Sequence, residues 1–181
     1  MAASHQINGV LLLDKPKGLS SNHALQQVRR LFGKTKGGYA GTLDPLASGL
    51  LPISMGEATK FINYFSDASK AYDAIIKLGF SSTTGDAEGE LSEAKVTFFD
   101  SRDLENVTHK FTGCIEQIPP MYSAIKVEGK PLYKLARQGK VIPRENRSIT
   151  IESLRLEKMD DNTVGLSVSC SKGTYLSLIH I

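Results

Sequence analysis

A chain of 181 residues is long enough to bury a hydrophobic core, and one domain is the default expectation at this length. Hydrophobic residues make up 40% of the chain and charged residues 23%, an ordinary globular composition that excludes a disordered or low-complexity protein. The net charge of +3 is compatible with nucleic acid as a partner without requiring it.

The compartment is inferred from what the sequence lacks. No apolar run approaches the roughly 18 residues of a membrane span. Residues 1–6 lack the basic and apolar regions of a signal peptide. The two cysteines, Cys114 and Cys170, lie far apart without metal-ligand partners nearby, so we expect buried free thiols. Together these features predict a cytoplasmic protein that makes no contact with a membrane.

The chain is expected to begin with a buried strand over residues 7–13, an apolar run. Lys15 lies in the loop that follows, where it is either solvated or in contact with a phosphate. A helix should follow, capped by Ser20 or Ser21 and running to about Phe32, because apolar residues recur on one face at helical spacing.

Residues 37–49 form a glycine-rich loop that contains a single carboxylate, Asp44. Glycine permits positive φ and lets a ligand approach the main chain closely. Basic residues stand just before the loop: Arg29, Arg30, Lys34 and Lys36. By local chemistry alone, an Asp followed by Pro45 favours a helix cap or a turn. The basic setting also allows the alternative that Asp44 belongs to a site for an anionic polymer.

After this loop we expect a strand over 50–55 and a helix over 57–65. Residues 70–80 alternate in hydrophobicity, which predicts a strand with Tyr72 on its apolar side, near its start. Residues 81–93 are polar and acidic. Their carboxylates suggest glycosidase chemistry or a cation site as alternatives, but the spacing matches no complete calcium loop, so a solvated loop is favoured.

The second half should alternate strands and helices. The expected elements are a strand over 95–99, a helix from Asp100 or Ser101 to Phe111, an extended segment over 114–118, a strand over 122–127, a helix over 131–138, and an antiparallel hairpin of 149–159 with 164–170. Residues 126–147 are the most basic stretch, and Tyr122 and Tyr133 lie in or beside it. Such a stretch suits looped RNA or, equally well, a solvated helix face. The whole pattern predicts an α+β domain.

Residues 41–51, Gly-Thr-Leu-Asp-Pro-Leu-Ala-Ser-Gly-Leu-Leu, resemble the catalytic signature of the tRNA pseudouridine synthase B family. Three further segments resemble that family in the right order: 8–18 with 20–22, 118–126, and 170–175. The resemblance covers nearly the whole chain. It implies the pseudouridine synthase fold, a mixed and mostly antiparallel sheet flanked by helices.

The resemblance also implies an activity. The family isomerises uridine 55 in the T-arm of tRNA to pseudouridine by cleaving the glycosidic bond, rotating the base and rejoining it, without a cofactor or a metal. It implies that Asp44 is the nucleophile and that Tyr72 packs on the target base and helps complete the proton transfer. The positions implied to bind the substrate are Lys15, Pro16, Tyr39, Gly41, Lys172 and Tyr175. Within this set, Lys15 and Pro16 match the family's N-terminal motif that braces the active-site loop, and Tyr175 matches a wall of the active site. The implied partner is tRNA, bound by a monomer.

Two departures from the family pattern stand out. Tyr39 occupies a position where the family has His, and it can still stack on a nucleotide. The family also continues past Tyr175 into an Ile-Arg pair whose Arg pairs with the catalytic Asp, whereas this chain continues with Leu176 and Ser177. Without that cation, Asp44 would hold its proton more tightly and be poorly placed.

The expectation is therefore a C-terminally truncated chain, in which residues 1–181 form part of a catalytic domain and the small RNA-binding domain is absent. Such a chain is expected to be inactive, and an unpaired sheet edge should make it poorly soluble. The alternative is a non-catalytic RNA-binding or tRNA-folding module of the same fold. A glycoside hydrolase is disfavoured because no convincing second carboxylate is present.

Overall fold

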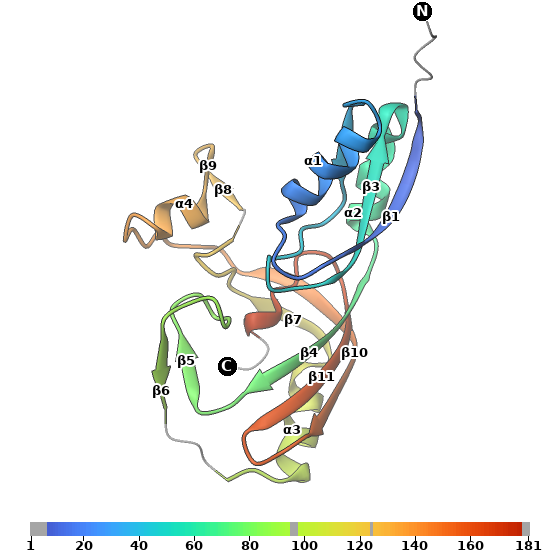
Figure 1. Ribbon diagram of the computed structural model, residues 1–181. Coiled ribbons are helices and arrows are strands. Elements are labelled where there is room, and N and C mark those ends of the chain that lie inside the picture. Colours follow the sequence, from blue (N-terminus) through green and yellow to red (C-terminus); the bar gives the residue numbers. More distant parts are fainter. Residues whose placement is uncertain (1–6, 95–97, 124, 179–181) are drawn as a thin grey trace, which may run out of the picture. The chain divides into compact units, whose positions relative to one another are not determined.

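The computed structural model describes residues 7–94, 98–123 and 125–178 (Figure 1). The chain divides into two compact units, one ending at Ala68 and the other beginning at Ser69. Each unit has its own sheet and its own core. Every strand pairing in the described residues is antiparallel, so the fold is α+β as the sequence predicts.

The first unit is a three-stranded sheet in the order β1-β3-β2 with helices packed against it. Its elements are β1 (Gly9–Lys15), α1 (Ser21–Leu31), β2 (Gly37–Tyr39), β3 (Gly49–Met55), the 3₁₀ helix η1 (Gly56–Phe61) and α2 (Ile62–Asp67). The pairing of Lys15 with Gly49 brings the end of β1 to the start of β3. The start of the loop after β1 therefore lies beside the end of the loop that precedes β3.

Helix α1 forms as predicted. Its cap is Ser20, whose hydroxyl accepts a hydrogen bond from the His23 amide. The buried face of the helix packs on β3 in a core made of Ala24, Leu25, Val28, Leu51, Ile53 and Met55. The expectation of a buried first strand is wrong, because β1 is an edge strand and most of its residues are exposed.

The helix expected over 57–65 is also different in the structure. The chain makes the 3₁₀ helix η1 before α2 begins at Ile62. Gly56 adopts a φ of +59°, and the Glu57 amide donates to the Asn8 side chain at 2.8 Å. This turn reverses the chain tightly at the end of β3, which a regular α-helix starting there would not do.

The second unit is a four-stranded sheet in the order β4-β11-β10-β7. Its strands are β4 (Lys70–Lys77), β7 (Gly113–Gln117), β10 (Arg147–Lys158) and β11 (Thr163–Cys170), and β5 (Phe80–Ser82) with β6 (Leu91–Glu93) and β8 (Lys126–Val127) with β9 (Lys130–Pro131) form two small hairpins. Its helices are α3 (Ser101–Phe111), α4 (Leu132–Ala136) and the 3₁₀ turn η2 (Leu176–Leu178). The predicted hairpin of β10 and β11 is confirmed.

The core of this unit lies on one side of the sheet. It comprises Ile149, Ile151, Leu154, Leu166, Val168 and Cys170. Tyr72, Ala74 and Ile76 of β4 pack against it, which confirms the predicted alternation along that strand. Helix α3 begins with a capping box between Asp100 and Asp103, and its Phe111 joins the same core.

Several other expectations need correction. The ends of segment 81–93 pair as the hairpin of β5 and β6, so this segment is not simply a solvated loop. Of the strand expected over 95–99, residues 95–97 lie outside the described residues and 98–99 are not extended in a sheet. The strand over 122–127 is limited to β8, and the helix over 131–138 is limited to α4.

Two further observations concern the cysteines and the length of the helices. Cys170 is buried as expected, but Cys114 is exposed, because its side chain points away from the core on edge strand β7. No helix within the described residues is long and apolar enough to cross a membrane.

Candidate active site

Asp44 lies on a loop that is tied down residue by residue. Leu43 packs against the core of the first unit. The buried hydroxyl of Ser21 accepts a hydrogen bond from the Leu43 amide and donates one to the Leu43 carbonyl, both at 2.9 Å. Asp44 itself is exposed. The residue before Asp44 is thus anchored in the core while Asp44 lies at the surface, an arrangement suited to meeting a substrate.

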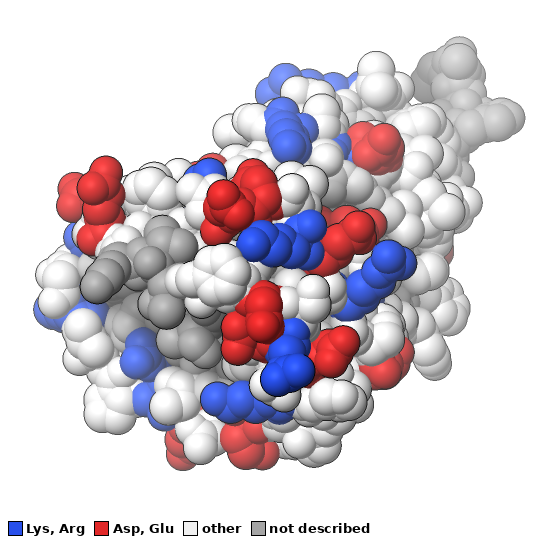
Figure 2. Space-filling view, turned by 90° about the horizontal axis from the view of Figure 1, so that it is seen from below, with Lys and Arg blue, Asp and Glu red and all other residues white. Residues whose placement is uncertain are grey.

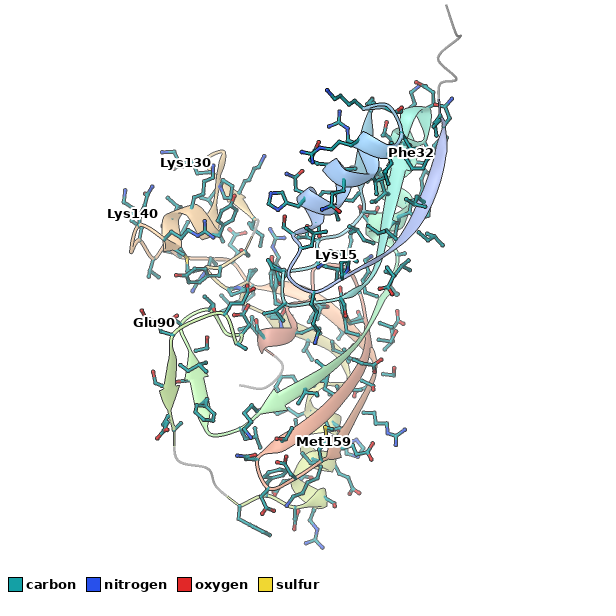
Figure 3. The ribbon with its side chains drawn as sticks, in the orientation of Figure 1. Lys15, Phe32, Glu90, Lys130, Lys140 and Met159 are labelled. Atoms are coloured by element: carbon teal, nitrogen blue, oxygen red, sulfur yellow. The ribbon has the colours of Figure 1, made fainter. Side chains whose placement is uncertain are left out.

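Lys15 holds the far end of the same loop. Its side chain is fully buried, and Nζ donates to the carbonyl oxygens of Pro16 at 3.0 Å, Leu19 at 2.7 Å and Ala47 at 2.6 Å. A lysine ammonium group has three donors, so these contacts account for all of them. The structure therefore shows Lys15 as a brace, in the position labelled in Figure 3. The alternative of a phosphate contact loses its donors.

Further main-chain contacts complete the brace. The Gly18 amide donates to the Pro45 carbonyl at 2.7 Å, and the Ala47 amide donates to the Asp44 carbonyl at 3.0 Å. Gly41 has a φ of +75°, which an L-residue rarely adopts, so the glycine there is a backbone requirement. The loop from Gly41 to Ala47 is consequently a rigid turn between the core and the segment after β1.

The remaining substrate-binding candidates of the first unit flank this loop. Pro16 is exposed, and its carbonyl is one of the three acceptors of Lys15. Tyr39 ends β2, pairs with Ile53 and packs half-buried against the core. Lys15, Pro16, Gly41 and Asp44 therefore belong to one braced structure, and Tyr39 leads into it through Ala40.

The second unit carries the other candidates. Tyr72 is half-buried on β4, opposite Val168. Tyr175 lies after β11, and its main chain is held by the buried side chain of Gln117, whose Nε2 donates to the Tyr175 carbonyl and whose Oε1 accepts from the Tyr175 amide, both at 2.9 Å. Leu176 packs on the same core as Tyr72. Lys172 is exposed in the turn that follows β11 and precedes Tyr175.

Two residues that position these candidates escaped the sequence analysis. Ser21 could be assigned only as a possible helix cap, and Gln117 only as part of an extended segment. Their signal in the sequence is weak, because each acts on a residue 22 or 58 positions away. A buried polar residue with long-range partners becomes recognisable only when those partners are placed.

The position at which the resemblance implies an arginine is Ser177. It lies half-buried in η2 next to the hairpin of β5 and β6, since a Cβ atom built on Gly85 would stand 3.2 Å from Cβ of Ser177.

On other parts of the surface, basic and acidic side chains are mixed. Figure 2 shows basic and acidic side chains interspersed on the face seen from below, and the hairpin of β10 and β11 pairs Arg155 with Glu157 and Lys158 with Asp161.

Comparison with known proteins identifies a family and its relatives. Residues 29–176 match the family described as TruB family pseudouridylate synthase (N terminal domain). The chain is 54% identical over 170 residues to tRNA pseudouridine synthase B of Pseudomonas aeruginosa strain UCBPP-PA14, covering 94% of this chain and 56% of that protein. It is 53% identical over 174 residues to the protein of the same name from Neisseria gonorrhoeae strain NCCP11945, covering 96% and 57%.

A solved structure shares the fold. The crystal structure of a Cbf5-Nop10-Gar1 complex aligns with a TM-score of 0.71 and 27% identity, covering 97% of this chain and 43% of that one. The fold is thus that of a pseudouridylate synthase. The chain belongs to the TruB family, through that family's N-terminal domain. It spans little more than half the length of the relatives that it matches.

Proposed function

We propose that this protein is a tRNA pseudouridine synthase that isomerises uridine 55 in the T-arm of tRNA, with Asp44 as its nucleophile. The observation that supports this most directly is the braced loop, which holds an exposed carboxylate between Leu43, anchored in the core, and Ala47, tied to Lys15. Preorganisation of this kind places a nucleophile without cost at the moment of reaction.

In this proposal the substrate base leaves its stack to reach Asp44. The carboxylate attacks C1′ of the sugar as the bond between C1′ and N1 of uracil breaks, the base rotates, and C5 then bonds to C1′ as the bond to the carboxylate breaks. The proton on C5 is then lost and N1 gains one, so the product is an isomer and no cofactor or metal is needed. Tyr72 packs on the base and assists this proton transfer, and Tyr175 forms another wall of the site. Tyr39 stacks on a nucleotide beside it.

The proposal also concerns how active this chain is. Ser177 stands at the position where the resemblance implies an arginine that pairs with the catalytic aspartate, and a serine carries no charge. We therefore expect little or no activity from the chain as it stands. Its partner would be tRNA, bound in the cytoplasm by a monomer.

The test is an assay of pseudouridine formation in a T-arm stem-loop RNA, read by tritium release from C5-labelled uridine. Four proteins are compared: the chain as it stands, Ser177→Arg, Asp44→Asn, and the double variant. Ser177→Arg should raise the rate by at least about tenfold, the value of one charge-assisted contact. Asp44→Asn should remove all activity in both backgrounds. Measurable and equal rates with Asp and Asn at position 44 in the Ser177→Arg background would disprove the proposed nucleophile.

A second candidate, a non-catalytic RNA-binding or tRNA-folding module, is favoured by the same serine at position 177. The basic stretch around α4, where Arg137 stacks over the Tyr133 ring at 5.5 Å, would serve binding alone. Binding of the T-arm RNA with no pseudouridine in any variant, Ser177→Arg included, would support this candidate over the enzyme.

A further inference from the structure

A pocket of about 470 Å³ lies wholly within the second unit. Four separate segments wall it: the hairpin turn 82–85, residues 120–122, the end of α4 with the loop that follows it, and η2. Figure 3 labels Lys140 on the loop after α4 and Glu90 on the hairpin of β5 and β6. No residue of the loop that carries Asp44 belongs to this pocket.

The electrostatic character of the pocket is positive. Lys140 and Arg144 are its charged lining residues, and none of the described residues that line it is acidic. Asp86, which follows the lining residues of the hairpin turn, accepts hydrogen bonds from the Thr84 hydroxyl at 2.6 Å and from the Glu88 amide at 3.0 Å. The lining thus presents two cations and no carboxylate among its described residues.

Arg144 carries an unmet requirement. Its Nε atom is buried and, within the described parts of the chain, finds no hydrogen-bond acceptor. A buried donor left without an acceptor costs about 1–3 kcal/mol, so such groups call for an explanation. A guanidinium binds a phosphate through two parallel N–H donors, and a bound phosphate would supply the missing acceptor.

Another wall of the pocket is apolar and aromatic. Pro120, Met121 and Tyr122 line the pocket, and Tyr122 remains 40% exposed. An aromatic ring beside a cationic wall is the arrangement that proteins use for single nucleotides, with the base stacked on the ring and the phosphate held by the cations. The volume lies within the range of small-molecule sites.

We propose that this pocket binds one nucleotide of an RNA chain, with its phosphodiester on Lys140 and Arg144 and its base against Tyr122. The assignment to RNA rather than to a free nucleotide rests on the proposed function, whereas the assignment to a nucleotide rests on the pocket alone. It makes Arg144 a substrate-binding residue in addition to those that the sequence indicated.

The experiment is a ¹H–¹⁵N NMR titration of the full chain with uridylyl-(3′,5′)-uridine, uridine 5′-monophosphate and uridine. Arg144→Gln and Lys140→Gln test the cations, and Arg144→Lys keeps the charge but removes the fork of donors. Arg155→Gln is the matched control, since Arg155 is exposed on β10 and does not line this pocket. The spectra also report whether each variant is folded.

The dinucleotide should shift amides of 82–85 and 139–144, bind about tenfold more weakly to Arg144→Gln, and bind unchanged to Arg155→Gln. Uridine should bind more weakly than either phosphorylated probe. Equal affinity for the Arg144→Gln and control proteins, or shifts confined to other residues, would overturn the proposal. Binding of the monophosphate without the dinucleotide would overturn the assignment to RNA. The NMR titration measures nucleotide binding and does not depend on catalysis. A chain that forms no pseudouridine in the tritium-release assay can therefore still bind the dinucleotide, so the proposed function and the proposed binding pocket can fail separately.

Discussion

Lys15 shows how one side chain can set the position of another. It is 0% exposed, and its ammonium group lies among carbonyl oxygens rather than carboxylates. Burial of a charge is costly unless every donor is satisfied, and here three main-chain acceptors meet that condition. The same three bonds join the segment after β1 to the loop of Asp44. The brace and the satisfied charge are therefore one structure.

Replacing Lys15 with Met should lower the free energy of unfolding by about 2–3 kcal/mol, because charged hydrogen bonds worth about 1.5–3 kcal/mol each are lost while the cost of burying a charge is removed. The measurement is urea unfolding followed by circular dichroism. The control is Lys17→Met, two residues further on and exposed, which should change stability by less than about 0.5 kcal/mol. Equal effects of the two substitutions would contradict the brace.

The two cysteines should differ in reactivity. Burial raises the pKa of the Cys170 thiol above its ordinary value of 9.0, whereas Cys114 is exposed. A thiol-disulfide exchange reagent at pH 8 should modify Cys114 in the native protein and Cys170 only after unfolding. The raised pKa also means that the native state keeps a proton that the unfolded chain releases. Cys170 should therefore contribute stability below about pH 9 and lose that contribution as the pH rises further. Similar native rates for the two thiols would show that Cys170 is not enclosed.

At the scale of elements, Ser21 and Gln117 do the same work in different units. Each uses one side chain to bind both the amide and the carbonyl of a loop residue, Leu43 in one case and Tyr175 in the other. Such a pair of bonds replaces the partner that a neighbouring strand would provide. The loop after β2 is thereby fixed to the start of α1, and the loop after β11 is fixed to the end of β7.

Replacing Gln117 with Met should cost about 1–2 kcal/mol of stability, because the Tyr175 amide and carbonyl lose their partner. Hydrogen exchange of the Tyr175 amide is the sharper measurement, and it should accelerate more than that of β11 amides. Glu116→Met on the exposed side of β7 is the control and should leave this exchange rate unchanged. Protection of Tyr175 that survives the loss of Gln117 would refute the contact.

At the scale of the whole molecule, the notable feature is the apolar surface that the first unit exposes. The side chains of Leu12 and Leu50 are 64% and 63% exposed. The pairings of Leu12 with Pro52 and of Asp14 with Leu50 put both leucines on the same face of the sheet. Edge strand β1 therefore combines an unpaired backbone with an apolar face, the combination that promotes association between molecules.

The double substitution Leu12→Thr with Leu50→Thr should raise the fraction of monomer in size-exclusion chromatography and leave stability within about 0.5 kcal/mol, since threonine suits a strand and no buried contact is lost. Leu51→Thr is the contrasting variant: its side chain is 1% exposed, and the loss should be about 2 kcal/mol or more. A double variant that associates as strongly as the unsubstituted chain would contradict the role of this apolar face.

The elements that depend on neighbouring residues were predictable from the sequence. The caps Ser20 and Asp100, the alternation along β4, and the hairpin of β10 and β11 all follow from local periodicity and turn chemistry. The loop of Asp44 was also recognisable, because its glycines and its carboxylate lie within 13 residues of sequence, 37–49. A pattern of this kind acts over a few residues, so one sequence is enough to reveal it.

Other features depended on the tertiary structure. The exposure of β1 follows from its place at the edge of a sheet, and an apolar run looks the same at the edge and in the centre. The contacts of Lys15 with Ala47 and of Gln117 with Tyr175 join residues 32 and 58 positions apart. Tertiary packing determines which distant polar groups meet. Once buried, each group loses water as a hydrogen-bond partner and must find one within the protein.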